Sequence, residues 1–237
     1  MRNGFRFIGL AAVAALSLTV LAAQDAIVLK RIAKVGDVEK YRMKAEAQVE
    51  GGAAVFTGVI TEKITKVADD GQYTMESTTT DNAVSFNGKD IPGGAAGAAD
   101  VATITCKASG EVVSVVTDRA DPNIYRMANL QALQFPSTPI KLGDSWDVTI
   151  KKDDRGSVDA KGTFKLEAKE KIGDYDCYRI RGSIKETAGD TPAAVEETFW
   201  VSAKDGTIVK SQGSFSNAPF PGANKPLDAR VEVNRIG

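Results

Sequence analysis

The sequence predicts a mainly β protein in which a curved antiparallel sheet or pair of sheets, a half-barrel or open barrel, surrounds one short helix at about 122–134. Three observations predict this class. Apolar and polar residues alternate over many short segments, as half-buried strands require. Turns that contain glycine separate these segments, which is typical of hairpins. A single segment shows helical spacing instead.

The alternation is longest at 41–50, where Tyr41, Met43, Ala45 and Ala47 share one apolar face and charged residues occupy the other. The same period of two returns at 146–151, 164–169, 178–184 and 231–233. Further strands are expected at 26–31, 53–67, 72–80, 101–107, 111–117, 194–203 and 206–215. Hairpins that follow one another along the chain predict an antiparallel meander.

The helix is predicted by its start and end signals as well as by its spacing. Asp121 can cap the helix and Pro122 suits its first turn, while Pro136 stops it. The apolar residues between them recur every three positions: Ile124, Met127, Leu130 and Leu133. We expect this helix to pack its apolar side onto a sheet.

The two halves of the chain resemble each other. Lys34-Val-Gly-Asp37 is echoed by Lys141-Leu-Gly-Asp144, and three further echoes follow in the same order. A duplication explains this order, although two unrelated meanders would also share glycine turns and alternating strands. The expected organisation is a signal peptide at 1–23, a first β half at 24–120, a helix and linker at 121–140 and a second β half at 141–237, together one compact unit.

The N-terminal segment has the pattern of a secretory signal peptide. Arg2 and Arg6 precede the apolar run 7–23, which ends in the small residues Ala22 and Ala23. A retained membrane anchor is the alternative, but the run is shorter than the about 20 residues of a membrane span. We therefore expect an exported protein, periplasmic or extracellular, with no transmembrane segment after cleavage.

Composition excludes several classes of function. Cleavage after Ala23 removes two of the 30 basic residues and none of the 31 acidic ones, so 28 against 31 remain and no basic field attracts nucleic acid. The chain contains no histidine, which removes the commonest general base and metal ligand. We expect no enzyme activity, no cofactor and no metal. Cys106 and Cys177 either form a disulfide in the oxidising compartment or remain a buried thiol and a lone thiol.

Other candidate sites have a structural explanation. The acid pairs 69–70 and 153–154 lack the looped spacing of calcium sites and are read as turns. Trp146 and Trp200 can be ligand platforms, but aromatic residues in strands are mostly core. The stretch from Phe215 to Pro221 can cover a sheet edge or meet a partner.

Two segments resemble known exported proteins. The phrase at 135–146, a proline-containing link followed by Gly143-Asp144-Ser145-Trp146, resembles one found in uncharacterised bacterial exported β proteins. The segment 197–210 is similar to the strand–turn–strand of LolA-like lipoprotein-carrier half-barrels. That resemblance implies a curved sheet that cups a lipid against helices. Those carriers have several lid helices, whereas this sequence offers one.

Two hypotheses about function follow. The first is a non-catalytic protein that binds a lipid or another apolar ligand in a groove between sheet and helix, lined by Ala45, Ala47, Ile124, Met127 and Leu130. The second is an envelope interaction or structural module that binds another exported protein or a surface polymer through a sheet edge or through the 215–221 stretch. A carboxylate-dependent hydrolase is a third and weaker alternative.

Overall fold

The computed structural model describes residues 26–92, 101–118, 121–221 and 223–237. The predicted signal peptide and most of the glycine-rich loop at 91–100 lie outside these residues. The strands are β1 (Val38–Val49), β2 (Gly52–Val67), β3 (Tyr73–Phe86), β4 (Lys89–Asp90), β5 (Val101–Cys106), β6 (Val112–Thr117), β7 (Ser145–Ile150), β8 (Ala160–Ile172), β9 (Tyr175–Glu186), β10 (Ala194–Ser202), β11 (Ile208–Ala218) and β12 (Leu227–Arg235). One helix, α1 (Pro122–Gln131), accompanies them in the described part of the chain.

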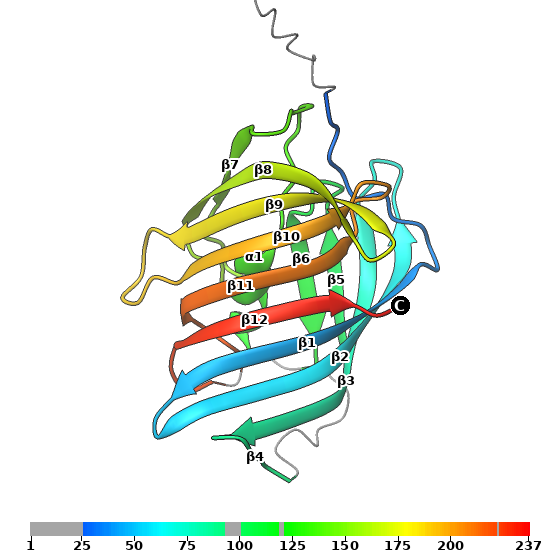
Figure 1. Cartoon of the computed structure of the whole chain (residues 1–237). Helices are drawn as coiled ribbons and strands as arrows, with labels where there is room; N and C mark the ends of the chain where they lie inside the picture. The colour runs from blue at the N-terminus through cyan, green and yellow to red at the C-terminus, as the bar shows by residue number, and fades with distance from the viewer. Residues whose placement is uncertain (1–25, 93–100, 119–120, 222) are drawn as a thin grey trace, which may run out of the picture.

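All the strands belong to one antiparallel sheet of 12 strands that does not close. Its order is β6-β5-β3-β2-β1-β12-β11-β10-β9-β8-β7, with β4 paired to β3. The sheet curls so that β5 and β6 lie behind the front strands and α1 lies within the curve, where it contacts both β6 and β10 (Figure 1). The predicted class, a curved and open antiparallel sheet around a short helix, is confirmed.

The helix begins as its sequence signals predict. The Asp121 carboxylate accepts a hydrogen bond from the Asn123 N–H at 2.8 Å, which satisfies one of the free donors of the first turn. The helix ends at Gln131, earlier than predicted, and the following segment 132–136, here called the linker, belongs to no helix or strand. A bidentate ion pair between Arg126 and Glu186 ties α1 to β9, with distances of 2.7 and 2.6 Å.

The segment 26–31 forms no strand, contrary to the sequence prediction. It makes one isolated bridge, between Ile27 and Ile140. Residues 27–33, here called the strap, instead run across the ends of two hairpins. The Arg31 N–H donates to the Ala108 carbonyl at 3.1 Å, and the Ile32 N–H donates to the Asp205 carbonyl at 2.8 Å. These bonds replace the ladder that a strand would have made.

The two halves of the sheet repeat the same local geometry. In the first, the Gly36 N–H donates to Ile64 O and the Ile64 N–H donates to Asp37 O, both at 2.9 Å. In the second, the equivalent bonds join Gly143 to Leu166 and Leu166 to Asp144, at 2.7 and 2.9 Å. A shift of strand register follows Ile64 on β2 and Leu166 on β8. These are the correspondences that a duplication would leave; the duplication itself remains a prediction.

The segment that leads into each half of the sheet binds a turn of the other half. The strap precedes the first half and binds the β10–β11 turn of the second half through Ile32 and Asp205. The linker precedes the second half and binds the β5–β6 turn of the first half, because the Phe135 N–H donates to Ser109 O at 2.7 Å. Each half is thus closed at one end by the segment that leads into the other.

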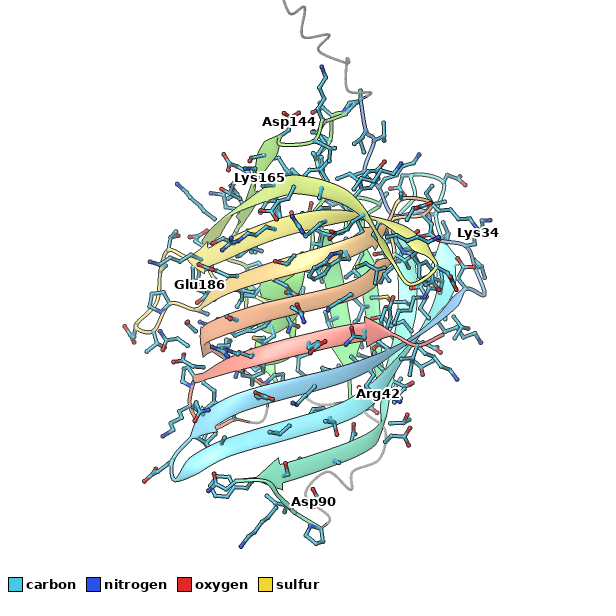
Figure 2. The ribbon with its side chains drawn as sticks, in the orientation of Figure 1. Lys34, Arg42, Asp90, Asp144, Lys165 and Glu186 are labelled. Carbon is cyan, nitrogen blue, oxygen red and sulfur yellow. The ribbon has the colours of Figure 1, made fainter. Side chains whose placement is uncertain are left out.

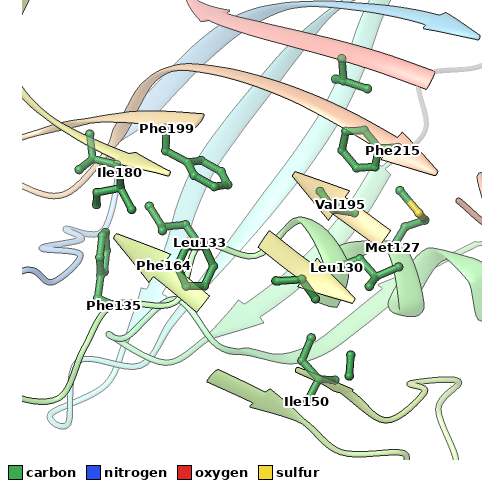
Figure 3. Close-up of a cluster of buried hydrophobic side chains, with 14 of the residues drawn as sticks. Met127, Leu130, Leu133, Phe135, Ile150, Phe164, Ile180, Val195, Phe199 and Phe215 are labelled. Carbon is green, nitrogen blue, oxygen red and sulfur yellow. The ribbon is translucent and has the colours of Figure 1, made fainter. Parts of the chain in front are cut away.

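The hydrophobic core is divided unequally between the halves. The larger cluster fills the space between α1, the linker and strands β8 to β12, and Figure 3 shows Phe164, Phe199 and Phe215 together with Met127 and Leu130 of the helix in this cluster. The smaller cluster lies against β2, β3, β5 and β6 and has only six buried members: Ile64, Tyr73, Cys106, Val112, Tyr125 and Ala132. Charged side chains such as Arg42 and Lys165 cover the outer surface (Figure 2).

Candidate functional site

A groove remains open inside the curved sheet where the core is thin. Its volume is about 320 Å³, at the lower end of the range for small-molecule sites. The sheet forms one wall, and the other wall comes from Ala128 and Gln131 of α1 and from the linker residues Leu133 and Phe135. Most of the lining side chains are apolar: Tyr41, Met43, Ile60, Ile64, Tyr73, Met75, Ile104, Val112, Leu133, Phe135, Phe199, Ile208, Val231 and Val233.

The strap brings a positive charge into this groove. Arg31 lines the cavity, and its guanidinium donates to a carboxylate oxygen of Glu39 at 2.6 Å. Both side chains are more than nine-tenths buried. The Tyr41 hydroxyl donates to the other Glu39 oxygen at 3.2 Å. The Glu39 carboxylate is therefore satisfied within the protein, as a buried charge must be.

A second carboxylate lies directly opposite Glu39. Glu39 on β1 and Glu62 on β2 are register partners, and both line the groove. Like charges placed opposite each other across a ladder repel. Glu62 makes no hydrogen bond or ion pair with another side chain among the described residues. One guanidinium thus faces two carboxylates, and Glu62 carries the surplus negative charge.

A third carboxylate reaches the groove from the second half. Glu197 lies on the inward face of β10, between the buried residues Val195 and Phe199, and is 8 % exposed. Its Oε2 atom is buried and has no hydrogen-bond partner among the described residues. Both of its direct register partners are glycines, Gly182 and Gly213, which carry no side chain.

Burial raises the pKa of both Glu62 and Glu197. Desolvation is the main cause that raises the pKa of Glu62 to about 7; the Glu39 charge adds to the rise and Arg31 opposes it. Desolvation also raises the pKa of Glu197 to about 7, against a smaller opposing effect of the Ser211 hydroxyl. Near neutral pH the groove therefore holds two carboxyl groups that can gain or lose a proton.

The ligand-binding residues predicted from the sequence do not line this groove. Met127 and Leu130 are buried in the larger core cluster, where they pack against the second half. Ala45 and Ala47 on β1 are half-buried beside the same cluster, and Ile124 is half-buried on the helix. The helix spacing identified the buried face correctly. That face, however, meets the packed half of the sheet, and Ala128 and Gln131 meet the open half.

The two tryptophans have different surroundings. Trp146 stacks on Phe164 with ring centroids 5.6 Å apart, and its Nε1 donates to the Gln134 carbonyl at 2.7 Å, so it is part of the core. Trp200 points to the outer face of β10. Its Nε1 donates to Glu170, and the Lys210 ammonium lies 5.2 Å from its ring centroid. Trp200 is therefore no core residue, and neither tryptophan lines the groove.

The 215–221 stretch offers less surface than the sequence suggested. Phe215 is part of β11, is 2 % exposed and packs within the larger cluster. The Phe220 ring lies 5.9 Å from the Phe215 ring and packs against the same cluster. These aromatic residues close one end of the core, so they do not form a free docking surface.

The two cysteines are separate thiols in this structure. Cys106 on β5 lines the groove, whereas Cys177 on β9 is fully buried elsewhere, and no disulfide joins them. Burial raises the pKa of the Cys106 thiol to about 11. In the sequence Cys177 is in step with Arg179 and Arg181, a phase that by the period of two would place it on a polar face. It is instead buried where the β10–β11 turn crosses the start of β9, with the Ala203 N–H donating to Asp176 O at 2.8 Å.

The groove carboxylates were not recognised in the sequence, although a signal was present. Glu39 is in step with Tyr41 and Met43, Glu62 with Ile60 and Ile64, and Glu197 with Val195 and Phe199. An acid on the apolar phase of a strand is placed inside the sheet by the period of two. Such acids rarely occur inside unless they are paired or functional.

A second depression lies on the outer face and differs in character. Its volume is about 400 Å³, and it is lined by charges of both signs. Several of these pair with one another, as Lys44 does with Glu46 at 2.5 Å and Arg181 with Glu196 at 3.7 Å. The described residues contain no cluster of acidic or sulfur side chains suited to a metal ion. The inner groove is therefore the candidate site.

Comparisons with known proteins add little to this description. No protein-family model matches the chain, and no curated protein matches it. One similar solved structure is a hypothetical lipoprotein, YmcC, from Escherichia coli (K12), 15 % identical with a TM-score of 0.34 over 84 % of this chain and 83 % of that one. Another is a DUF1329 family protein from Desulfovibrio piger, 9 % identical with a TM-score of 0.25 over 85 % of each chain.

The geometry defines a class by itself: an open antiparallel half-barrel with an internal groove that is apolar and acidic. Among the described residues, no helix combines the length and the apolar character needed to cross a bilayer.

Proposed function

We propose that this chain is an exported, non-catalytic protein that binds a lipid or a similar apolar ligand in the groove between the sheet and the α1–linker wall. One observation carries the proposal: a cavity of about 320 Å³ with mainly apolar walls persists inside the curved sheet, beside a large and well-filled core cluster. An unfilled apolar cavity costs stability, so its retention favours a role in binding. The absence of histidine in the sequence supports a non-catalytic role.

A fluorescent apolar probe, N-phenyl-1-naphthylamine, tests the proposal by its emission on binding. We expect wild-type protein to bind the probe and Ala128→Phe to lose most of that binding, because Ala128 lines the groove and a phenyl ring would occupy it. The matched control is Ile124→Phe, which enlarges a half-buried residue of the same helix outside the lining.

Native mass spectrometry of gently purified protein provides the second measurement. We expect apolar small molecules to accompany the wild type and to be depleted from Ala128→Phe. If Ala128→Phe binds the probe as well as Ile124→Phe does, the groove is excluded as the binding site. A wild type that binds no probe and arrives without ligand would exclude it as well.

A further inference from the structure

We propose that the groove selects an amphiphile with a cationic head, an ammonium group on an apolar chain, and that Glu62 and Glu197 provide the selection. This inference rests on the proposed function and specifies its ligand. It begins from the charges that line the cavity: three carboxylates, of Glu39, Glu62 and Glu197, and one guanidinium, of Arg31. The ion pair between Arg31 and Glu39 uses the only positive charge of the lining, so two carboxylates remain uncompensated.

The unpartnered atom of Glu197 is the second observation. Its Oε2 is buried, accepts no hydrogen bond within the described residues and belongs to a side chain that lines the groove. A buried carboxylate oxygen without a donor is costly, and a donor supplied by a ligand would remove that cost. A cation with N–H groups supplies charge and donors together, whereas an anionic head would add repulsion.

The corresponding positions of the other half carry no acids. Glu39 and Glu62 are register partners on β1 and β2, and the corresponding partners on β7 and β8 are Trp146 and Phe164. The same turn geometry at Gly36 and Gly143 sets this correspondence. At these positions the rings of Trp146 and Phe164 stack on each other. Of the two acids, Glu39 is held by Arg31 and Tyr41, whereas Glu62 has no side-chain hydrogen bond or ion pair among the described residues and is free to meet a ligand.

The groove should bind such a cation more tightly as the carboxyl groups lose their protons. Burial raises the pKa of Glu62 and Glu197 to about 7, so proton release between pH 6 and pH 8 would create the anions that the head needs. The groups that face Glu62 are Arg31, Glu39, Tyr41, Tyr73 and Cys106. The pKa values of Tyr41 and Tyr73 lie above their ordinary value and that of Cys106 is about 11, so these three do not titrate in that interval.

Competition against N-phenyl-1-naphthylamine tests the inference with three ligands of one chain length: dodecylamine, dodecanol and dodecanoate, each kept below its micelle concentration. We expect dodecylamine to displace the probe at about tenfold lower concentration than dodecanol, and dodecanoate to be the weakest. From pH 6 to pH 8 the affinity for dodecylamine should rise several-fold and that for dodecanol should stay constant.

The variants locate the effect. Glu62→Gln/Glu197→Gln should abolish the preference for dodecylamine and its pH dependence while dodecanol still binds. Glu46→Gln, which removes an exposed carboxylate on the outer face, controls for nonspecific attraction of the amine and should behave as the wild type. A thermal melt confirms that each variant is folded.

The outcomes separate the two proposals. If dodecanol and dodecylamine bind equally to the wild type, or if the double variant keeps the preference, the carboxylate selection is wrong and the apolar groove stands. If neither ligand displaces the probe at all, the proposed function fails as well.

Discussion

The two halves of this sheet share one local geometry and use it differently. At one pair of corresponding positions the second half has Trp146 stacked on Phe164, and the first half has Glu39 opposite Glu62. The aromatic pair fills the space below the strands, so the second half holds most of the core. The acid pair instead lines the groove, whose walls also include Phe199, Ile208 and Val231 of the second half. Corresponding strand positions thus carry stacked rings in the core of one half and groove-lining acids in the other.

Substitutions at these corresponding positions should have opposite effects on stability. Phe164→Ala should lower the free energy of unfolding by about 3–5 kcal/mol, because Phe164 is 1 % exposed and its loss leaves a cavity. Glu62→Leu at pH 8 should instead raise it by about 1–2 kcal/mol, because an apolar group replaces a desolvated charge. Urea unfolding at pH 8 measures both. Destabilisation of similar size at the two positions would contradict the comparison.

The acids of the groove should also make stability depend on pH. Since the folded pKa of Glu197 is about 7 and lies above its ordinary value of 4.5, the folded state holds the proton more tightly. The stabilising contribution is complete below pH 4.5 and is lost as the pH rises through 7, a change of about 3 kcal/mol. We expect the stability difference between Glu197→Gln and wild type to change by that amount between pH 4.5 and pH 8.

The strap and the linker each pack against a glycine in a turn, and replacing either glycine should lower stability by a similar amount. Gly206 and Gly110 both have a positive φ, and a Cβ at either would lie within 2.2 Å of a backbone carbonyl, that of Lys30 in the strap or Leu133 in the linker. Gly206→Ala and Gly110→Ala should each lower the free energy of unfolding by about 2 kcal/mol or more. Gly173→Ala is the control, since its φ is positive but its Cβ would meet nothing. Chemical unfolding measures the free energy of unfolding of the three variants. If Gly173→Ala lowers it as much as the other two do, contacts with the strap and linker are unimportant.

The smallest effect is expected at the edge of the packed half. Trp146→Phe keeps a ring over Phe164 but removes the hydrogen bond from Nε1 to the Gln134 carbonyl. The expected loss is about 1 kcal/mol, with the groove unchanged. Unfolding together with N-phenyl-1-naphthylamine binding measures both. A large loss of probe binding would mean that the linker wall depends on this bond.

Much of this architecture follows from local rules. Alternation placed the strands, glycine turns placed the hairpins, and Asp121 with Pro122 placed the start of the helix, because each of these signals acts within a few residues. The echo between Lys34–Asp37 and Lys141–Asp144 corresponds to equivalent hydrogen bonds in the structure. The inward orientation of Glu39, Glu62 and Glu197 was also present in the period of two.

Tertiary structure alone decided where the open space lies. Alternation shows which residues share a face of the sheet, but not what packs against that face. The distance between the sheet and the α1–linker wall depends on curvature summed over many strands and on the path of the covering chain. For this reason Met127 and Leu130 were predicted in the groove and lie in the core, and 26–31 was predicted as a strand and forms the strap. The sequence by itself determined the strands, the turns and the facing of each side chain; the curled sheet decided which inward faces meet a packed wall and which enclose a cavity.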